Sequence, residues 1–461
     1  MFRKKSIDEW ALDYWLLQQY ARLCFRIYYK KIRVVNLYNI PKNQPVIIAP
    51  NHQNALMDAM LFVSVTKSQI VFLARADIFK GKLLIRLLTY LNIMPIYRLR
   101  DGIENVKRND EVFAKTARVL RNKFNPLCIF PEGNHGDRRR LRNLVKGIFR
   151  IALRAHEEYG EKPGVKIVPI GIDYGHYQNF RTTLLVNVGQ PIEISEYSRL
   201  YRENPVQALN QLKERFAAEL RKLMIDIRSE EYYETYMGLR TIYNTEMRKH
   251  LSISGNSPEA RFRADKAMIG MLDLELESSP EFISRLDNLV SDYSHRVKQA
   301  RFRDWVLSRD RYSVPVICMD TLIGIILLPV FVLGCISNYV PYRFTETRTR
   351  NIKDPQFHSS IKYVTGMVVF PTWYLFMTVA ICFIPAVTWI KWTFVLLMPL
   401  TGLPAFHYYI GAKKLLSRIR YTLGVIRKRP EILRMKELRK DILGMMTDLV
   451  NRQIVSHEGS R

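Results

Sequence analysis

A histidine and an aspartate that could activate a hydroxyl group lie near the start of the chain, at His52 and Asp58. An imidazole can take the hydroxyl proton, while a carboxylate fixes the imidazole tautomer and stabilises the imidazolium. No Gly-x-Ser-x-Gly motif accompanies them, so the attacking oxygen can belong to the substrate. An isolated pair of this kind more often caps a helix, and the catalytic interpretation therefore depends on other motifs.

Three further motifs follow apolar runs in the same way as the histidine motif does. They read Pro-Ile-Tyr-Arg at 95–98, Phe-Pro-Glu-Gly-Asn-His-Gly-Asp-Arg at 130–138 and Val-Pro-Ile-Gly at 168–171. In this order the four motifs resemble the glycerolipid acyltransferase superfamily, whose members esterify glycerol-3-phosphate or lysophosphatidic acid. The resemblance covers roughly residues 46–189, and the motif that begins at Phe130 is its most specific part.

The resemblance implies a role for five residues. His52 would be the catalytic base and Asp58 its partner, while Arg98, Glu132 and Gly133 would lie on the glycerol-phosphate side of the site. A guanidinium just past a strand can hold a phosphate through two parallel hydrogen bonds. A glycine permits a tight turn or a close approach of the backbone.

The spacing of the first motif departs from the family pattern, which is His-x4-Asp, whereas this chain has His-x5-Asp. Position 57 is Met, so Asp58 is the only nearby carboxylate. Residues five or six apart do not share a face of a regular helix, and we therefore expect His52 in the turn before the helix. The longer gap, together with Asp137 and Arg138, also resembles a fungal-type glycerol-3-phosphate acyltransferase branch.

Metal or redox chemistry is not expected. His135 and Asp137 lack a His-x3-His or cysteine partner, and the five cysteines form no Cys-x-x-Cys motif. The resemblance implies no cofactor, only acyl-CoA or acyl-ACP (acyl carrier protein) as co-substrate. The basic run at 138–142 and Lys146 could hold phosphate, the donor or the membrane, and the sequence assigns none of these roles to a single residue.

The 71 Lys and Arg against 43 Asp and Glu give a formal net charge of +28, which suits nucleic acid or anionic lipid. Apolar runs in the last third of the chain favour lipid. The expected partners are membrane lipids, the acyl donor and a glycerol phosphate acceptor, without nucleic acid; the oligomeric state stays open.

Strand and helix patterns alternate through the first half, which predicts an α/β fold with a mostly parallel sheet flanked by helices. Predicted strands cover 46–49, 71–74, 93–96, 127–130, 165–170 and 184–188, and predicted helices cover 78–91, 111–124 and 144–158. The expected segments are an N-terminal amphipathic interfacial helix and lead-in (1–45), an acyltransferase domain (46–200), a helical region (201–312), a transmembrane region (313–411) and a basic amphipathic C-terminal tail (412–461).

Three apolar runs, 314–340, 363–384 and 389–410, are each close to the length that crosses a bilayer. No secretory signal is visible, so we expect a multi-pass membrane protein with a cytoplasmic catalytic domain. Three crossings would place the basic tail on the opposite face, although basic segments favour the cytoplasm. Two crossings, with one run re-entrant or interfacial, fit the sequence equally well.

Other functions remain open at this stage. An acyltransferase for another lysolipid, in remodelling or aminolipid chemistry, would share the motifs, and Arg98→Ala would separate it because only a phosphate-bearing acceptor should lose binding. A non-catalytic lipid-binding membrane protein would consume no thioester. A nucleic-acid binder is disfavoured because the charge is spread along the chain rather than gathered on one motif.

Overall fold

The computed structural model describes residues 11–97, 109–121, 125–159 and 164–458. The chain divides into two compact units. Unit 1 comprises residues 1–226 and the separate segment 348–367, and unit 2 comprises residues 227–347 and 368–461. These units differ from the segments expected from the sequence, because residues 1–45, residues 201–226 and the separate segment 348–367 all belong to unit 1.

Unit 1 is built on one sheet whose strands follow the order β1-β7-β6-β2-β5-β3-β4, with β8 paired to β6. All pairs are parallel except those of β6 with β7 and β8, so the predicted mostly parallel sheet is confirmed. The strands are β1 (Lys31–Val35), β2 (Val46–Pro50), β3 (Val71–Arg75), β4 (Ile93–Ile96), β5 (Leu127–Cys128), β6 (Lys166–Tyr174), β7 (Thr183–Val188) and β8 (Ile192–Glu193).

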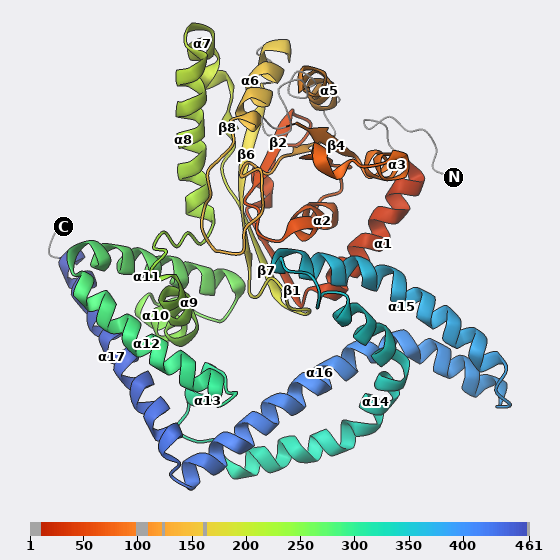
Figure 1. The fold of residues 1–461 in the computed structure, drawn as a ribbon, viewed down its shortest axis with the longest axis vertical. Helices are drawn as coiled ribbons and strands as arrows, with labels where there is room; N and C mark the ends of the chain where they lie inside the picture. Colours follow the sequence, from red (N-terminus) through yellow and green to blue (C-terminus); the bar gives the residue numbers. More distant parts are fainter. Residues whose placement is uncertain (1–10, 98–108, 122–124, 160–163, 459–461) are drawn as a thin grey trace. The chain divides into compact units, whose positions relative to one another are not determined.

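Helices cover both faces of this sheet (Figure 1). They are α1 (Leu12–Tyr28), α2 (Ala55–Val65), α3 (Lys82–Tyr90), α5 (Asn109–Arg121), α6 (Gly147–Tyr159), α7 (Ser195–Glu203) and α8 (Pro205–Leu223). Along β2, Ile47 and Ala49 enter one core with residues of α5, α6 and α8. Val46 and Ile48 enter the other core with residues of α1 and α2. A strand buried on both faces must be apolar throughout, which explains the uninterrupted run before the histidine motif.

The N-terminal helix α1 is apolar on more than one face. Tyr14, Ala21 and Phe25 are buried against unit 1, while Leu16 and Leu23 are each 56% exposed. Its buried face holds the helix on the domain, and its exposed apolar side chains suit the headgroup layer of a membrane.

Unit 2 is helical. Its elements are α9 (Tyr233–Ile242), α10 (Asn244–His250), α11 (Pro258–Ser278), α12 (Pro280–Gln299), α13 (Asp304–Leu307), α14 (Val314–Thr347), α16 (Thr388–Ile426), α17 (Pro430–Glu458) and the second part of α15 (His358–Cys382). The C-terminal helix α17 packs against α12 and buries its apolar stripe, which includes Met435, Leu438 and Ile442. That stripe of the predicted tail therefore faces protein.

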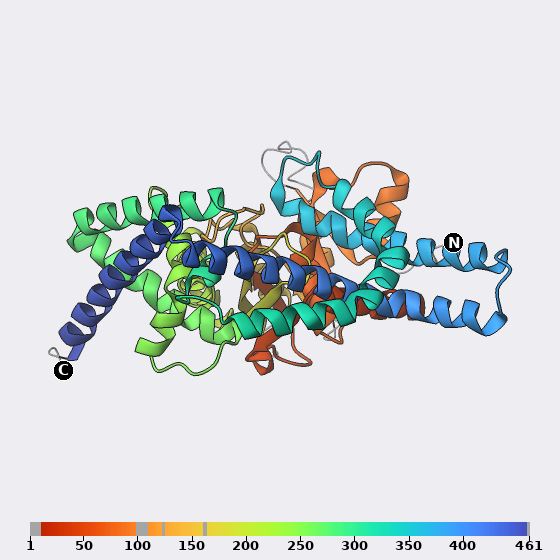
Figure 2. The ribbon, with the colours of Figure 1, turned by 90° about the horizontal axis from the view of Figure 1, so that it is seen from below.

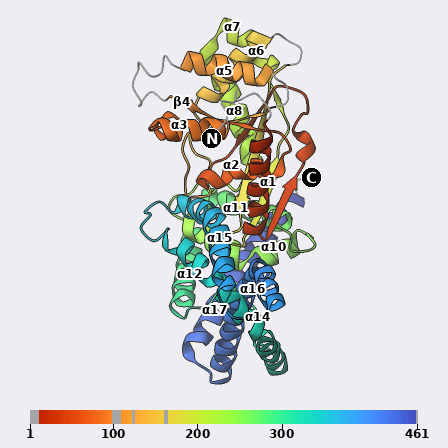
Figure 3. The ribbon, with the colours of Figure 1, turned by 90° about the vertical axis from the view of Figure 1, so that its right-hand side faces the viewer.

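Three helices, α14, α15 and α16, are long and apolar enough to cross a membrane by length and composition. Helices α14 and α16 lie side by side (Figure 3). They run antiparallel, because Asp320 pairs with Arg418 whereas Asn338, further along α14, bonds to the earlier residue Met398. The part of α15 in unit 2 and the start of α16 form a hairpin that turns at residues 383–387 (Figures 1 and 2).

Candidate active site

His52 and Asp58 are in direct contact. The imidazole Nδ1 lies 2.9 Å from Asp58 Oδ2, and the two side chains are 15% and 0% exposed. Asp58 lies in the first turn of α2, while His52 lies three residues before that helix begins, as the spacing required. The contact leaves Nε2 for another group, because no hydrogen bond reaches it from the residues that the structure describes.

The Asp58 carboxylate is fixed from several directions. Its Oδ2 also accepts hydrogen bonds from the backbone N–H groups of Gln53 and Asn54, at 2.9 and 2.7 Å. The Tyr174 hydroxyl donates to Oδ1 at 2.5 Å, and burial together with Asp58 raises the pKa of Tyr174 well above its usual value. A buried charge that accepts four hydrogen bonds is satisfied without any ion pair to Lys or Arg.

The turn before α2 is pinned to the sheet on one side. The Asn51 side chain accepts a hydrogen bond from the Ile172 N–H at 2.6 Å and donates to the Ile172 carbonyl at 3.2 Å. It thus bonds to both backbone groups of a residue of β6. At the other end of the turn, Ala55 has φ of 42°, a left-handed conformation that costs free energy in a non-glycine residue. We attribute to this turn the room for a fifth residue between His52 and Asp58, where the family pattern has four.

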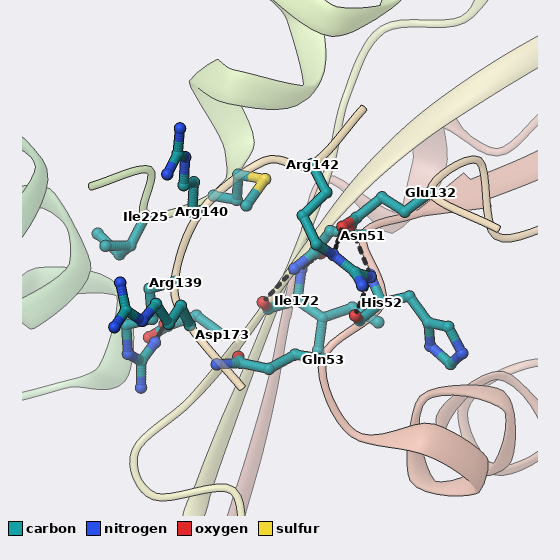
Figure 4. A pocket seen from close by; sticks show the side chains of 12 residues that line it. Asn51, His52, Gln53, Glu132, Arg139, Arg140, Arg142, Ile172, Asp173 and Ile225 are labelled. Carbon is teal, nitrogen blue, oxygen red and sulfur yellow. Dashed lines mark hydrogen bonds and ion pairs between the residues drawn. The ribbon is translucent and has the colours of Figure 1, made fainter. Parts of the chain in front are cut away.

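Glu132 bonds to the turn that carries His52. Its Oε1 accepts the His52 backbone N–H at 2.9 Å, and its Oε2 pairs with Arg142 Nε at 2.7 Å. Arg142 also donates to the His52 carbonyl at 3.2 Å, so it bridges the two motifs (Figure 4). Burial raises the pKa of Glu132, and Arg142 opposes this effect. Gly133 has φ of 64°, and a Cβ there would lie 3.0 Å from Val145.

A small cleft lies beside this loop (Figure 4). Its lining includes His52 and Glu132 together with four arginines of the basic run, Arg138, Arg139, Arg140 and Arg142. Arg139 is buried and pairs with Asp173, and Arg142 is committed to Glu132. These two arginines therefore stabilise the wall of the cleft, and the paired carboxylates offset their charges.

The His52 ring contacts two other rings. It stacks on Phe130, with ring centroids 4.0 Å apart, and meets His135 edge-on at 5.5 Å. Burial lowers the pKa of His135 to about 4, helped by the neighbouring His52 and Arg142. His135 is therefore neutral at pH 7 and places no second positive charge beside an imidazolium at His52. Among the described residues, no three His, Cys, Asp or Glu side chains are grouped as metal ligands.

The segment 348–367 completes this side of unit 1. Phe357 packs edge-on against His135, with ring centroids 4.7 Å apart. The buried Ser359 hydroxyl donates to Asn54 Oδ1, and the N–H of Asn54 in turn holds Asp58. Residues some 300 positions away in sequence, at the start of α15 and just before it, thus support the turn that carries His52.

Replacing Ser359 by Ala should slow turnover by roughly tenfold or less while leaving KM for the acyl donor unchanged. The buried Asn54 Oδ1 would lose the donor that the structure gives it, at a cost of about 1–3 kcal/mol. Thermal unfolding and steady-state kinetics measure both effects. Ser360→Ala is the matched control, because the buried Ser360 hydroxyl has no hydrogen-bond partner among the described residues. Equal effects of the two substitutions would contradict the role of Ser359.

Of the predicted site residues, the structure brings His52, Asp58, Glu132 and Gly133 together around one loop. Arg98 lies outside the described residues. Sequence reasoning missed Tyr174, which follows the predicted end of its strand, as well as Asn54 and Ser359. It noted Arg142 only as part of a charge run. Tyr174 carried a weak signal, since it is the aromatic end of an apolar strand.

The sheet, the histidine turn and the supporting Glu-Gly turn define the class of protein. Residues 31–173 match the family model described as Acyltransferase. The family match and the names of the relatives below support a place for these residues in the glycerolipid acyltransferase superfamily.

The relatives are similar to only part of this chain. Glycerol-3-phosphate O-acyltransferases 1 and 2 of Saccharomyces cerevisiae are 33% and 30% identical to this chain over 121 and 115 residues. The matches cover 26% and 24% of this chain, and the chain spans only 15% of the length of each relative. An uncharacterised acyltransferase of Schizosaccharomyces pombe is 31% identical over 16% of this chain and 11% of its own length.

One solved structure, the 1-acyl-sn-glycerophosphate (LPA) acyltransferase PlsC from Thermotoga maritima, aligns with 45% of this chain and 79% of its own. The sequence identity is 20% and the TM-score is 0.33.

Proposed function

We propose that this chain moves an acyl group from an acyl thioester to a hydroxyl of glycerol-3-phosphate or lysophosphatidic acid, in phospholipid biosynthesis. The observation that carries the proposal is the contact of 2.9 Å between His52 Nδ1 and Asp58 Oδ2. The names of the two yeast relatives support glycerol-3-phosphate as an acceptor. Acyl-CoA or acyl carrier protein would supply the thioester.

In the proposed reaction, His52 Nε2 takes the proton of the acceptor hydroxyl as its oxygen attacks the thioester carbonyl carbon. Asp58 holds the Nδ1 proton and stabilises the imidazolium, as the carboxylate does in other hydroxyl-activating triads. The tetrahedral intermediate then collapses, the carbon–sulfur bond breaks, and the thiolate takes the proton from the imidazolium. The products are an ester and a free thiol.

The acceptor phosphate would be held by positive charge near the histidine loop. Arg98 is proposed for this role on its motif alone, which begins within β4 at Pro95. Glu132 acts differently from a direct substrate ligand, since its two oxygens bond to His52 and Arg142. It therefore positions the loop, and Gly133 allows the turn beside it. Holding the acceptor close to the base replaces a diffusive encounter with an oriented one.

An acyl-transfer assay on membranes that contain the protein tests this function. Glycerol-3-phosphate and lysophosphatidic acid are compared as acceptors, and coenzyme A and carrier protein thioesters as donors. We expect ester formation with a glycerol phosphate acceptor and, in Arg98→Ala, a rise in its KM of about ten- to a hundredfold, the equivalent of roughly 1.5–3 kcal/mol for a hydrogen bond to a charged group. Transfer only to phosphate-free lysolipids, unchanged in Arg98→Ala, would refute the proposal.

A further inference from the structure

The segment 348–367 runs from the end of α14 through the first residues of α15, yet it is an integral part of unit 1. Tyr363 is 3% exposed within the unit 1 core, and its hydroxyl donates to the Ala21 carbonyl at 2.7 Å. Ser359 donates to Asn54, and the Tyr20 hydroxyl donates to the Met367 carbonyl at 2.5 Å. A segment anchored in this way lies on the same face of the membrane as the acyltransferase domain.

The path of the chain before α14 determines on which face of the membrane that helix starts. The chain leaves unit 1 at residue 226 and reaches Val314, the first residue of α14. Residues 227–312 are all described, and none of their helices is long and apolar enough to cross a membrane. Helix α14 therefore begins on the face that unit 1 occupies, and it ends just before Arg348, where the chain re-enters unit 1.

We infer that α14 does not cross the membrane but lies in the leaflet nearest the acyltransferase domain, entering and leaving it on the same face. If α14 crossed the membrane, residues 348–367 would lie on the opposite face from the domain into which they are packed. The inference goes beyond the proposed function and does not depend on it.

The distribution of charge supports this topology independently. Both flanks of α14 are basic, with Arg301, Arg303, Arg309 and Arg311 before it and Arg348, Arg350 and Lys353 after it. Basic residues gather on one face of a membrane, so a helix that crossed it should have few basic residues on one of its two flanks. By contrast, Lys391 is the only Lys, Arg, Asp or Glu between Tyr363 and Ala412.

The length and the polar contacts of α14 agree with a helix along the leaflet. Its 34 residues extend for about 51 Å, whereas crossing about 30 Å of hydrocarbon needs about 20 residues. Asp320 pairs with Arg418 at 2.6 Å near one end. Asn338 bonds to the Met398 carbonyl at 3.1 Å near the other end, so α14 and α16 stay paired along this length.

The hairpin of α15 and α16 is the part that penetrates furthest. Beyond unit 1, residues 368–382 of α15 rise only about 22 Å before the turn. The turn is apolar and open, with Phe383 84% and Val387 58% exposed. Helix α16 then returns to lie beside α14. The acyltransferase domain, the helical region and α17 consequently share one face of the membrane.

Cysteine labelling in sealed vesicles tests the inference. In a background that keeps only the buried Cys128, single cysteines replace Tyr38 (unit 1), Ser308 (before α14), Thr347 (after α14), Phe383 (hairpin turn) and Glu431 (start of α17). A membrane-impermeant maleimide should label Ser308→Cys, Thr347→Cys and Glu431→Cys from the same side as Tyr38→Cys. Phe383→Cys should stay unlabelled until detergent is added.

Labelling of Thr347→Cys only after detergent, while Ser308→Cys reacts in sealed vesicles, would overturn the inference. If Thr347→Cys reacts poorly even in detergent, Asn351→Cys, four residues further along the chain, replaces it in the experiment. Labelling of Phe383→Cys from the Tyr38 side would overturn the deep position of the hairpin. The readout does not involve acyl transfer, so its failure is distinct from a failure of the proposed function.

Discussion

His52→Ala should lower the rate of acyl transfer by about 10²–10⁴-fold, the range that a positioned general base contributes, with little change in KM for the acyl donor. The ring is the only group described beside Asp58 that can take a proton from a hydroxyl at neutral pH, and its Nε2 has no partner among the described residues. Steady-state kinetics with saturating donor measure the change in kcat.

The substitution should leave the fold intact. His52 holds its place chiefly through backbone groups, since its N–H bonds to Glu132 and its carbonyl to Arg142. Thermal unfolding and sedimentation with membranes check this. His176→Ala, the same change at an exposed histidine of unit 1, is the matched control and should keep its activity. If turnover of His52→Ala matched that of the control, the assignment of the base would fail.

The parts of the fold that the sequence predicted well are those with a local physical cause. The run 46–49 must be apolar because both faces of β2 are buried, and the turn that follows carries His52. The need for a turn between His52 and Asp58 followed from helix geometry alone, and the structure has that turn. By contrast, β1 was missed because its basic, exposed residues continue the pattern of the preceding helix.

Contacts between distant segments could not be predicted in this way. Nothing in the sequence near Ser359 or Phe357 indicates that they meet Asn54 and His135, because their spacing signals only a polar connection between apolar runs. Tyr174 was missed for a related reason, since its hydroxyl reaches Asp58 only after β6 has paired with β2. The motif residues could be found because their chemistry is local in sequence. The residues that hold them in place could not be found, since those contacts form only through tertiary packing.

Asp58→Asn is the second substitution with a large expected effect, a fall in kcat of about 10²–10⁴-fold. The amide has nearly the shape of the carboxylate and can still accept from His52 Nδ1–H and from the backbone of Gln53 and Asn54 through its oxygen. It lacks the negative charge that stabilises the imidazolium, so His52 becomes a weaker base. The loss should therefore appear in kcat rather than in binding of the acyl donor.

Tyr174→Phe separates the charge of Asp58 from its hydrogen bonding. It removes only the bond of 2.5 Å to Oδ1 and leaves the carboxylate and its contact with His52 in place. We expect a fall of roughly tenfold, the equivalent of about 1.4 kcal/mol, close to the lower end for a hydrogen bond to a charged group. A Tyr174→Phe defect as large as that of Asp58→Asn would mean that the buried network is needed only for structure. A clear difference between them would assign to the Asp58 charge a direct part in stabilising the protonated base.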